Sequence, residues 1–231
     1  MNLDYRLNTA VELLDEAHSL GFEQLNLFNE NKLILPPCKI KNSTIENSTF
    51  EVQEDRFHIN VHNGQFSYQL DKQKGIFSRI EKAGKAIIQQ PLDFNIWRAP
   101  TDNDRLIREA WQNAGYDKAY TRAYEIQWQQ SEQAVEFSVK SAIVSISRGR
   151  ILTLDICYRI FNDGQISMEI NAIRPAELPY LPRFGLRFWL SKAENTVEYF
   201  GYGEQESYVD KHHLAKLGIY RTTAKQIIPI M

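Results

Sequence analysis

Residues 94–105 (FNIWRAPTDNDR) gather aromatic, cationic, anionic and amide side chains around Pro100. A proline pushes the residue before it, here Ala99, into an extended conformation. Asp102 and Asn103 can hydrogen bond to their own backbone. The stretch is therefore predicted to be a strand that runs into an ordered turn, and this turn is either a functional site or a rigid corner of the fold.

Two pairs of carboxylates could supply acid-base chemistry. Asp102 and Asp104 are separated by one residue, and so are Glu204 and Glu206. Cleavage of a glycosidic bond uses two carboxyl groups, one as acid and one as base or nucleophile. Carboxyls at i and i+2 on a strand would lie ~7 Å apart on one face. The amide and glycine residues around both pairs also suggest turns in which acids bind backbone amides. Turn fixing is the favoured interpretation and catalysis the alternative.

Aromatic side chains near charged ones suggest a carbohydrate-facing groove, since sugar rings stack on flat side chains and their hydroxyls take polar partners. The residues concerned are Trp97, Tyr199, Phe200, Tyr202 and Tyr208, with Arg98, Asp102, Arg183 and Glu206 beside them. Alternatively, Trp97 and Phe200 fill a sandwich core. In that case Arg98 or Arg183 would bridge buried carboxylates at loop corners. Burial habits favour this second interpretation.

The histidines do not form a metal-binding motif. His58 and His62 lie on a predicted strand, where they would be ~13 Å apart and could not share one ion. His212 and His213 adjoin Asp210, but no further ligand at recognisable spacing completes a zinc site. No metal site is predicted in this chain.

The composition is that of an ordinary soluble globular protein. The chain has 231 residues, 43% of them hydrophobic and 12% aromatic, and a formal net charge of -2. This length can bury a core, and the balanced charge gives no basic footprint for nucleic acid. No apolar run approaches the ~18 residues of a membrane span, and no secretory leader is recognised. Cys38 and Cys157 lack the signatures of a disulfide framework or a nucleophile. A cytoplasmic location and two unpaired thiols are expected.

Alternation with a period of two dominates the chain and predicts antiparallel strands. Residues 57–70 alternate in polarity around Asn63-Gly64, which is a type I′ hairpin signal. Residues 152–172 do the same around Asp163-Gly164. Several such strands, each with one buried face and joined by short turns, predict an all-β fold with sheet-on-sheet packing.

Two segments have helical spacing, and one segment resembles a linker. Residues 9–20 could form an amphipathic helix by spacing alone. Residues 106–114 are predicted to be helical, with Gly115 as the stop signal. Pro36-Pro37 and the polar residues 41–48 offer little apolar surface for a core. A domain boundary is therefore predicted near residue 37.

Three ordered motifs resemble the last domain of LacZ-type β-galactosidases (glycoside hydrolase family 2). Residues 97–104 (WRAPTDND) resemble its W-R-A-P-x-D-N-D signature, and residues 181–188 (LPRFGLRF) its L-P-R-x-G-x-x-F strand. Residues 197–210 are similar to its W/Y-x-G-x-G-P-x-E-x-Y-x-D segment, although Glu204 replaces the usual Pro and Ser207 the usual Asn. These departures concern the local turn more than the resemblance itself.

A fourth motif lies upstream. Residues 17–24 (AHSLGFEQ) are similar to the G-H-x-I-A-x-E-Q strand that closes the preceding immunoglobulin-like domain of that family, with Ala17 in place of Gly. The resemblance therefore implies strands rather than a helix at residues 9–20. It divides the chain into a remnant of the immunoglobulin-like domain and linker at 1–37 and a β-supersandwich at 38–231. The supersandwich would be similar to galactose mutarotase folds and truncated at its C-terminal end.

The resemblance also implies where the chemistry lies. The catalytic glutamates of this family, and the ligands of its Mg and Na ions, belong to a (β/α)₈ barrel, and no barrel pattern occurs here. No catalytic residue, cofactor or metal ion is thus expected in this chain. The family-signature or carbohydrate-facing residues would be Trp97, Arg98, Asp102, Asn103, Asp104, Arg183, Glu206 and Tyr208.

The complete enzyme would be a homo-oligomer that hydrolyses terminal β-D-galactosides such as lactose with retention of configuration. The other domains of the enzyme would be the partners of this chain, which alone should be inactive.

Two alternatives stay open. One is a stand-alone carbohydrate-binding or mutarotase-like module, although a mutarotase needs positioned His and Glu groups, and His58 and His62 lack an evident carboxylate partner in the sequence. The other is the small subunit of a two-chain β-galactosidase. The remnant of a preceding domain argues against the second alternative.

Overall fold

The computed structural model describes residues 1–25, 50–146, 148–203 and 212–223. The chain divides into two units, one made of residues 1–41 with 193–231 and the other of residues 42–192. From their places in the sequence alone, we call the first the outer unit and the second the central unit, and each is described by itself. The predicted boundary near residue 37 lies outside the described residues and stays a prediction.

The central unit contains a five-stranded antiparallel sheet in simple sequential order. Its strands are β3 (Glu51–Glu54), β4 (His58–His62), β5 (Phe66–Asp71), β6 (Ile76–Lys82) and β7 (Lys85–Ala86). The β4–β5 hairpin predicted around Asn63-Gly64 is present. Its predicted type I′ turn is wrong, because Gly64 does not adopt a positive φ. Asn63 Oδ1 instead accepts the backbone N–H groups of Gln65 and Phe66, at 2.9 and 2.7 Å.

A four-stranded antiparallel sheet forms the second layer, in the order β12-β11-β10-β9. Its strands are β9 (Tyr120–Gln130), β10 (Ala134–Ser145), β11 (Gly149–Phe161) and β12 (Ile166–Ile173). The predicted β11–β12 hairpin is confirmed, and Gly164 in its turn has φ +83°. A short pair, β8 (Asp93–Asn95) with β13 (Gly185–Arg187), lies in the same unit. The all-β sandwich prediction is confirmed.

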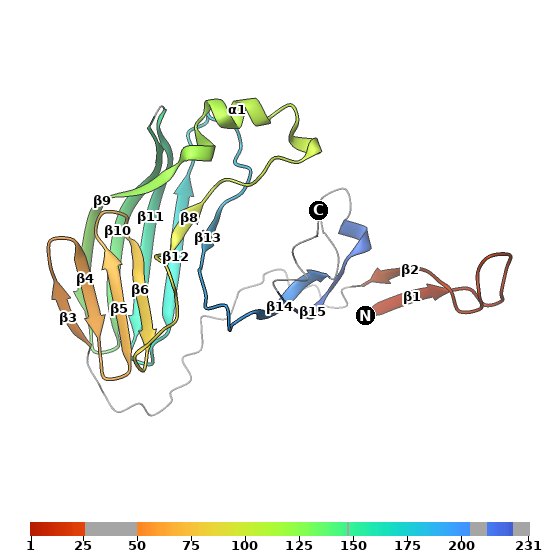
Figure 1. Ribbon diagram of the computed structural model, residues 1–231, viewed down its shortest axis with the longest axis horizontal. Coiled ribbons are helices and arrows are strands. Elements are labelled where there is room, and N and C mark those ends of the chain that lie inside the picture. The colour runs from red at the N-terminus through yellow and green to blue at the C-terminus, as the bar shows by residue number, and fades with distance from the viewer. Residues whose placement is uncertain (26–49, 147, 204–211, 224–231) are drawn as a thin grey trace. The chain divides into compact units, whose positions relative to one another are not determined.

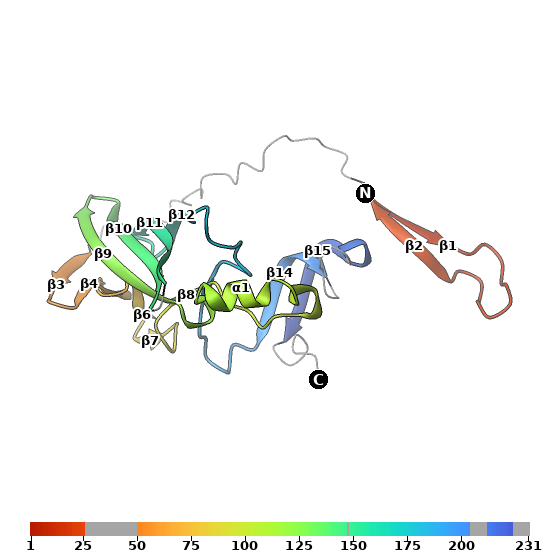
Figure 2. The same ribbon diagram turned by 90° about the horizontal axis from the view of Figure 1, so that it is seen from above.

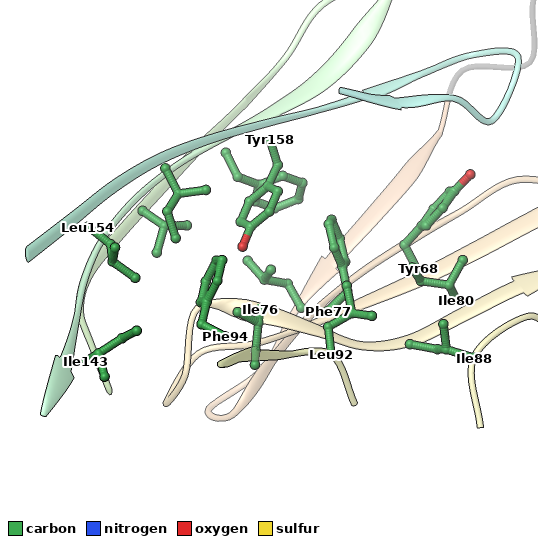
Figure 3. Packing of buried hydrophobic residues seen from close by; sticks show 14 of the residues in the cluster. Tyr68, Ile76, Phe77, Ile80, Ile88, Leu92, Phe94, Ile143, Leu154 and Tyr158 are labelled. Carbon is green, nitrogen blue, oxygen red and sulfur yellow. The ribbon is translucent and has the colours of Figure 1, made fainter. Parts of the chain in front are cut away.

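The core lies between these two layers, which face each other in both ribbon views (Figures 1 and 2). Phe77 of β6 and Tyr158 of β11 meet edge to face at 5.0 Å between ring centroids; Figure 3 shows them projecting toward each other from the two layers. The Tyr158 hydroxyl donates to the Gly75 carbonyl at 3.0 Å and the Tyr68 hydroxyl to the Gly164 carbonyl at 2.8 Å. Burial raises the pKa of Tyr68 to about 12. Two buried phenols thus join the turns of opposite sheets.

Short helical segments follow β8. They are η1 (Asp102–Asp104), α1 (Arg108–Asn113) and η2 (Tyr116–Lys118). The predicted helix at 106–114 is confirmed with a later start, and Gly115 ends it with φ +76°. Trp111 of α1 is fully buried and so anchors this helix to the core. No helix of the described residues is long and apolar enough to cross a membrane.

The outer unit consists of two hairpins. The first pairs β1 (Asn2–Arg6) with β2 (Ser19–Gln24), and the second pairs β14 (Thr196–Gly203) with β15 (Lys216–Thr223), after η3 (His212–Leu214). Residues 9–20 do not form a helix: Val11 and Leu14 form an isolated bridge, and Leu13 and Ala17 have positive φ. The predicted helix is therefore wrong, and of the strands that the resemblance implies for residues 9–20 only the start of β2 at Ser19 is present. The side-chain amide of Gln24 bonds both backbone groups of Leu217, at 2.6 and 3.0 Å.

Candidate functional site

The signature turn at residues 97–104 is organised by the buried carboxylate of Asp104. Both guanidinium Nη atoms of Arg98 donate to it, Nη2 to Oδ1 at 2.8 Å and Nη1 to Oδ2. The backbone N–H and the hydroxyl of Thr101 also donate to Oδ2, at 2.8 and 3.0 Å. This carboxylate therefore has four donors, and the Arg98 hydrogen bonds, followed by those from Thr101, lower its pKa to about 2. It is an ionised acceptor at neutral pH.

Arg98 connects this turn to a distant segment of the chain. Its Nε donates to the Pro182 carbonyl at 3.2 Å, and its guanidinium lies 5.5 Å from the ring centroid of Trp111. Trp111 Nε1 donates to the Tyr180 carbonyl at 2.8 Å, and the Tyr116 hydroxyl to the Pro179 carbonyl at 2.6 Å. Carbonyls of residues 179–182 thus take donors from Arg98 and from the helical segments after it. We call this arrangement the Arg98–Asp104 corner.

The structure therefore brings Arg98 and Asp104 together and leaves Asp102 apart. Asp102 and Asn103 are exposed on η1. Asp104 fixes the turn, in agreement with the favoured interpretation, and the first carboxylate pair does not converge as an acid and a base. The next residues of the loop include Leu106, which is 88% exposed. Glu204, Glu206 and Tyr208 lie outside the described residues.

The aromatic and basic candidates also differ from one another in burial and in contacts. Trp97 is half-buried and meets Trp111 edge to face at 6.4 Å, so it packs against the core as the second interpretation expected. Phe200 does not, because 73% of it is exposed. Arg183 is also exposed, and no ion pair of the described residues includes it. Of these two arginines, Arg98 is the one for which the described part of the chain shows a bridge to a buried carboxylate.

Asn95 is a site residue that sequence reasoning missed. Its buried side chain donates to the Trp97 carbonyl at 2.8 Å and accepts the Trp97 N–H at 3.2 Å. This closes a small ring of hydrogen bonds where the chain leaves β8 for the signature turn. The only signal in the sequence was an amide side chain two residues before a tryptophan, which is not specific.

The strand histidines have carboxylate partners, contrary to the sequence-based expectation. His62 Nε2 lies 3.2 Å from a Glu51 oxygen, and His58 Nδ1 lies 3.7 Å from an Asp55 oxygen. The Glu51 contact exists because β3 pairs antiparallel with β4 and places Glu51 opposite His62. The two contacts are separate, and no group of three or more potential metal ligands occurs among the residues that the structure describes. Cys157 is a half-buried free thiol, and Cys38 lies outside the described residues.

A shallow depression of about 240 Å³ lies on the four-stranded sheet. It is lined by Gln127, Trp128, Gln129, Glu136, Phe137, Ser138 and Cys157. The Glu136 carboxylate accepts from Gln129 Nε2 at 2.8 Å and from Arg159 Nε at 2.9 Å, and these bonds lower its pKa. The Trp128 indole donates to Glu54 at 2.8 Å. The polar groups of the depression could bind the hydroxyls of a small ligand. Glu136 is the one carboxylate in its lining, so the depression offers no pair of carboxyls for acid-base catalysis.

Comparison with known proteins identifies similar sequences. A family model described as "Beta galactosidase small chain" matches residues 62–229. The chain is 90% identical over 226 residues to a β-galactosidase of Actinobacillus pleuropneumoniae, covering 98% of this chain and 22% of that protein. It is 32% identical over 157 residues to the β-galactosidase of Staphylococcus xylosus, covering 68% and 16% of the two chains.

A third relative, the β-galactosidase of Pseudoalteromonas haloplanktis, is 28% identical over 238 residues, which cover 98% of this chain and 23% of the relative. The chain thus spans about a fifth of the length of these relatives. The matched residues 62–229 include the Arg98–Asp104 corner, the depression and the β14–β15 hairpin.

Proposed function

The chain belongs to the β-galactosidase small chain family, and from this premise we propose that it is a non-catalytic scaffold portion of a β-galactosidase. The complete enzyme hydrolyses terminal β-D-galactosides such as lactose. The carboxylates that cleave the glycosidic bond, together with any bound Mg and Na ions, belong to a part of the enzyme outside this chain. The complete enzyme is a cytoplasmic homo-oligomer.

The observation that carries this proposal is the state of Asp104. A retaining glycosidase needs one carboxyl that holds a proton and a second one as nucleophile, ≈ 5–5.5 Å apart. Asp104 is held ionised by Arg98 and Thr101, with a pKa of about 2, so it cannot serve as the acid at neutral pH. Its neighbour Asp102 is exposed and is not held by the corner. The family signature therefore supports a structural role in this chain.

The corner gives the following loop a defined position. Asp102 and Asn103 project from η1, whose two ends are fixed through Thr101 and Asp104. We propose that Asp102 and Asn103, with Trp97 and Arg183, face the sugar pocket or the catalytic portion of the complete enzyme. Glu206 and Tyr208 lie outside the described residues, and their family-signature or carbohydrate-facing role stays a prediction.

The test is turnover of an aryl β-galactoside. The purified chain should give no hydrolysis above the buffer rate. Mixing it with a complementary fragment that contains the remaining residues of the Actinobacillus pleuropneumoniae relative should restore activity in proportion to the complex formed. Hydrolysis by the chain alone would contradict the proposed role.

A second candidate function is a carbohydrate-binding module, which the depression on the four-stranded sheet favours. Its polar lining and its volume of about 240 Å³ suit a monosaccharide. Calorimetric titration with galactose and lactose should then show saturable binding with a millimolar or lower Kd. A Gln129→Ala variant should weaken this binding, since Gln129 positions the Glu136 carboxylate. Absence of saturable heat would exclude this candidate and leave the scaffold role.

A further inference from the structure

Two buried hydroxyl groups of the four-stranded sheet have no hydrogen-bond partner in the described part of the chain. They are Thr121 Oγ1 on β9 and Ser141 Oγ on β10. Only 5% of Thr121 and 2% of Ser141 is exposed, so bulk water does not reach either group. Nearly all buried polar atoms of proteins have a hydrogen-bond partner, and one that lacks it lowers stability. Two such hydroxyls in one sheet therefore point to a bound polar ligand.

Both hydroxyls face the core of the central unit. Ser141 lies opposite Leu154 of β11, and Thr121 lies opposite Ile143 of β10. Residues that lie directly opposite each other in an antiparallel pair have their side chains on the same face of the sheet. Leu154 and Ile143 belong to the core cluster, and Figure 3 shows both projecting into it. The burial of the two hydroxyls is therefore a property of the central unit itself.

The two side chains are diagonal neighbours on adjacent strands. Thr121 lies opposite Ile143, which is two residues along β10 from Ser141. Diagonal neighbours have Cβ atoms ~7 Å apart, which is too far for a direct hydrogen bond of ~2.8 Å between two hydroxyls. A water molecule that makes one such bond to each oxygen spans up to ~5.6 Å. Because both oxygens extend from their Cβ atoms, one water molecule can reach both.

The β9–β10 ladder is irregular beside these hydroxyls. Its register shifts between Lys140 and Ser141, and Tyr124 has no residue opposite it. A bulge of this kind leaves the extra residue out of the ladder. The N–H of Ala123 donates to the Gln73 carbonyl at 2.8 Å, in the turn between β5 and β6 of the other sheet. The hydroxyls therefore lie at a point where one sheet is joined to the other.

The side chains on the core face become small at the bulge. The pair Ile126 with Val139 is followed by the pair Ala123 with Ser141, and this step removes more side-chain volume than the ~30 Å³ that one water molecule occupies in the liquid. The turn of the opposite sheet covers part of this room, since a Cβ atom on Gly75 would lie 3.2 Å from the Ala123 Cβ. The place is thus small and enclosed, which suits one water molecule rather than a larger ligand.

We propose that Thr121 and Ser141 together bind one buried water molecule, which joins β9 to β10 beside the bulge. Each hydroxyl is both a donor and an acceptor, so the water can donate to one and accept from the other. Buried water molecules typically bond about three polar groups, and the bulge supplies backbone groups for the third bond. The water holds the two strands in register where Ala123 reaches the other sheet.

Oxygen-17 relaxation dispersion of the whole chain tests the proposal, because it counts the water molecules that stay in a protein for long residence times. Thr121→Val and Ser141→Ala should each lower this count by one, and the double variant should lower it by no more than one. Thr121→Ser, which keeps the hydroxyl, should keep the water. The matched control is Thr153→Val with Ser167→Ala, two partly exposed residues of the same sheet, and it should leave the count unchanged.

Urea unfolding of the same variants gives an independent measurement. Each single substitution leaves the other hydroxyl unsatisfied, so each should raise the unfolding equilibrium constant about fivefold, and the double variant should differ from either single one less than twofold. If the hydroxyls bind no water, both single substitutions should stabilise the chain and the count should not change. If each hydroxyl binds its own water, the double variant should lose two waters and the two effects should multiply. Either of these results would overturn the proposal.

Discussion

At the scale of single residues, the Arg98–Asp104 pair explains why this turn has so many charged groups. The Asp104 carboxylate is buried, so its four donors replace the water that it loses on folding. The planar fork of arginine matches the two carboxylate oxygens. The same guanidinium also reaches Pro182 and Trp111. One side chain thus connects the signature turn, the helix and residues 179–182.

Asp104→Asn should destabilise the chain by about 2 kcal/mol, because the amide keeps the shape but removes the negative charge that faces the partly buried guanidinium of Arg98. Urea unfolding followed by tryptophan fluorescence measures this loss. The control is Asp102→Asn on the same turn, which should change the free energy of unfolding by less than ~0.5 kcal/mol because Asp102 is exposed. Equal effects of the two variants would contradict the structural role of Asp104.

The contribution of Asp104 should also depend on pH. Its pKa is lowered from 3.8 to about 2, chiefly by the Arg98 hydrogen bonds. A carboxyl whose pKa is lower in the folded state stabilises the fold at pH values above its unfolded-state pKa. This stabilisation is lost as the pH falls through the folded-state pKa. The difference in unfolding free energy between the wild type and Asp104→Asn, about 2 kcal/mol at pH 6, should therefore shrink between pH 4 and pH 2. A free-energy difference that stays constant between pH 4 and pH 2 would show that the charge of Asp104 is not the source of the stabilisation.

The sequence predicted the composition of this site better than its contacts. A proline and two Asx residues favour a turn by local chemistry, and that part is confirmed. The choice between Asp102 and Asp104 as the Arg98 partner depends on how the chain curves after Pro100, which local patterns do not contain. The His62–Glu51 contact depends on the register of β3 and β4 in the same way. Such partners become visible only when strands are paired.

At the scale of elements, the two predicted hairpins show how similar signals lead to different turns. Both have an Asx-Gly pair between alternating strands. Gly164 is left-handed, and an ideal Cβ on it would lie 2.3 Å from the Phe66 ring. Gly64 does not have a positive φ, and a Cβ atom placed on it would have no heavy atom within 4 Å. The difference arises because Gly164 lies against the opposite sheet, where Tyr68 also bonds its carbonyl, and this packing is not encoded in the dipeptide.

Gly164→Ala should therefore destabilise the chain by roughly 2 kcal/mol, since the methyl group adds backbone strain and overlap with Phe66. Gly64→Ala is the matched control and should be neutral or slightly stabilising, because alanine loses less chain entropy on folding. Chemical denaturation of both variants provides the measurement. If Gly64→Ala were the more harmful change, the two turns would be misassigned.

The strands themselves follow from the sequence because burial on one face requires an apolar residue at every second position. The helix after the signature turn follows equally well from Gly115 as its stop. Residues 9–20 do not follow from their apolar spacing. Their apolar spacing suits a helix, yet Leu13 and Ala17 have positive φ, which a continuous right-handed helix does not allow. Only the motif at residues 17–24 favoured strands.

At the scale of the whole molecule, the buried apolar residues are distributed very unevenly. Those that form the core cluster lie between Phe50 and Ile160, all in the central unit. Among the described residues of the outer unit, Ala215 is the one apolar side chain that is buried. Burial of apolar area is the main source of stability. The two units should therefore differ strongly in local stability.

Native-state hydrogen exchange of the isolated chain should reveal this difference. Amides in the centre of β10 and β11 should exchange only by global unfolding, whereas those of β1, β2, β14 and β15 should open locally and be protected at least ~100-fold less. A Phe137→Ala variant, which removes a fully buried ring of β10, should cost about 3–5 kcal/mol. It should speed exchange in β10 and β11 and leave that of the outer hairpins unchanged. Uniform protection across both units, or a shared response to Phe137→Ala, would instead mean that the chain folds as one cooperative body and that the hairpins need no further polypeptide to stabilise them.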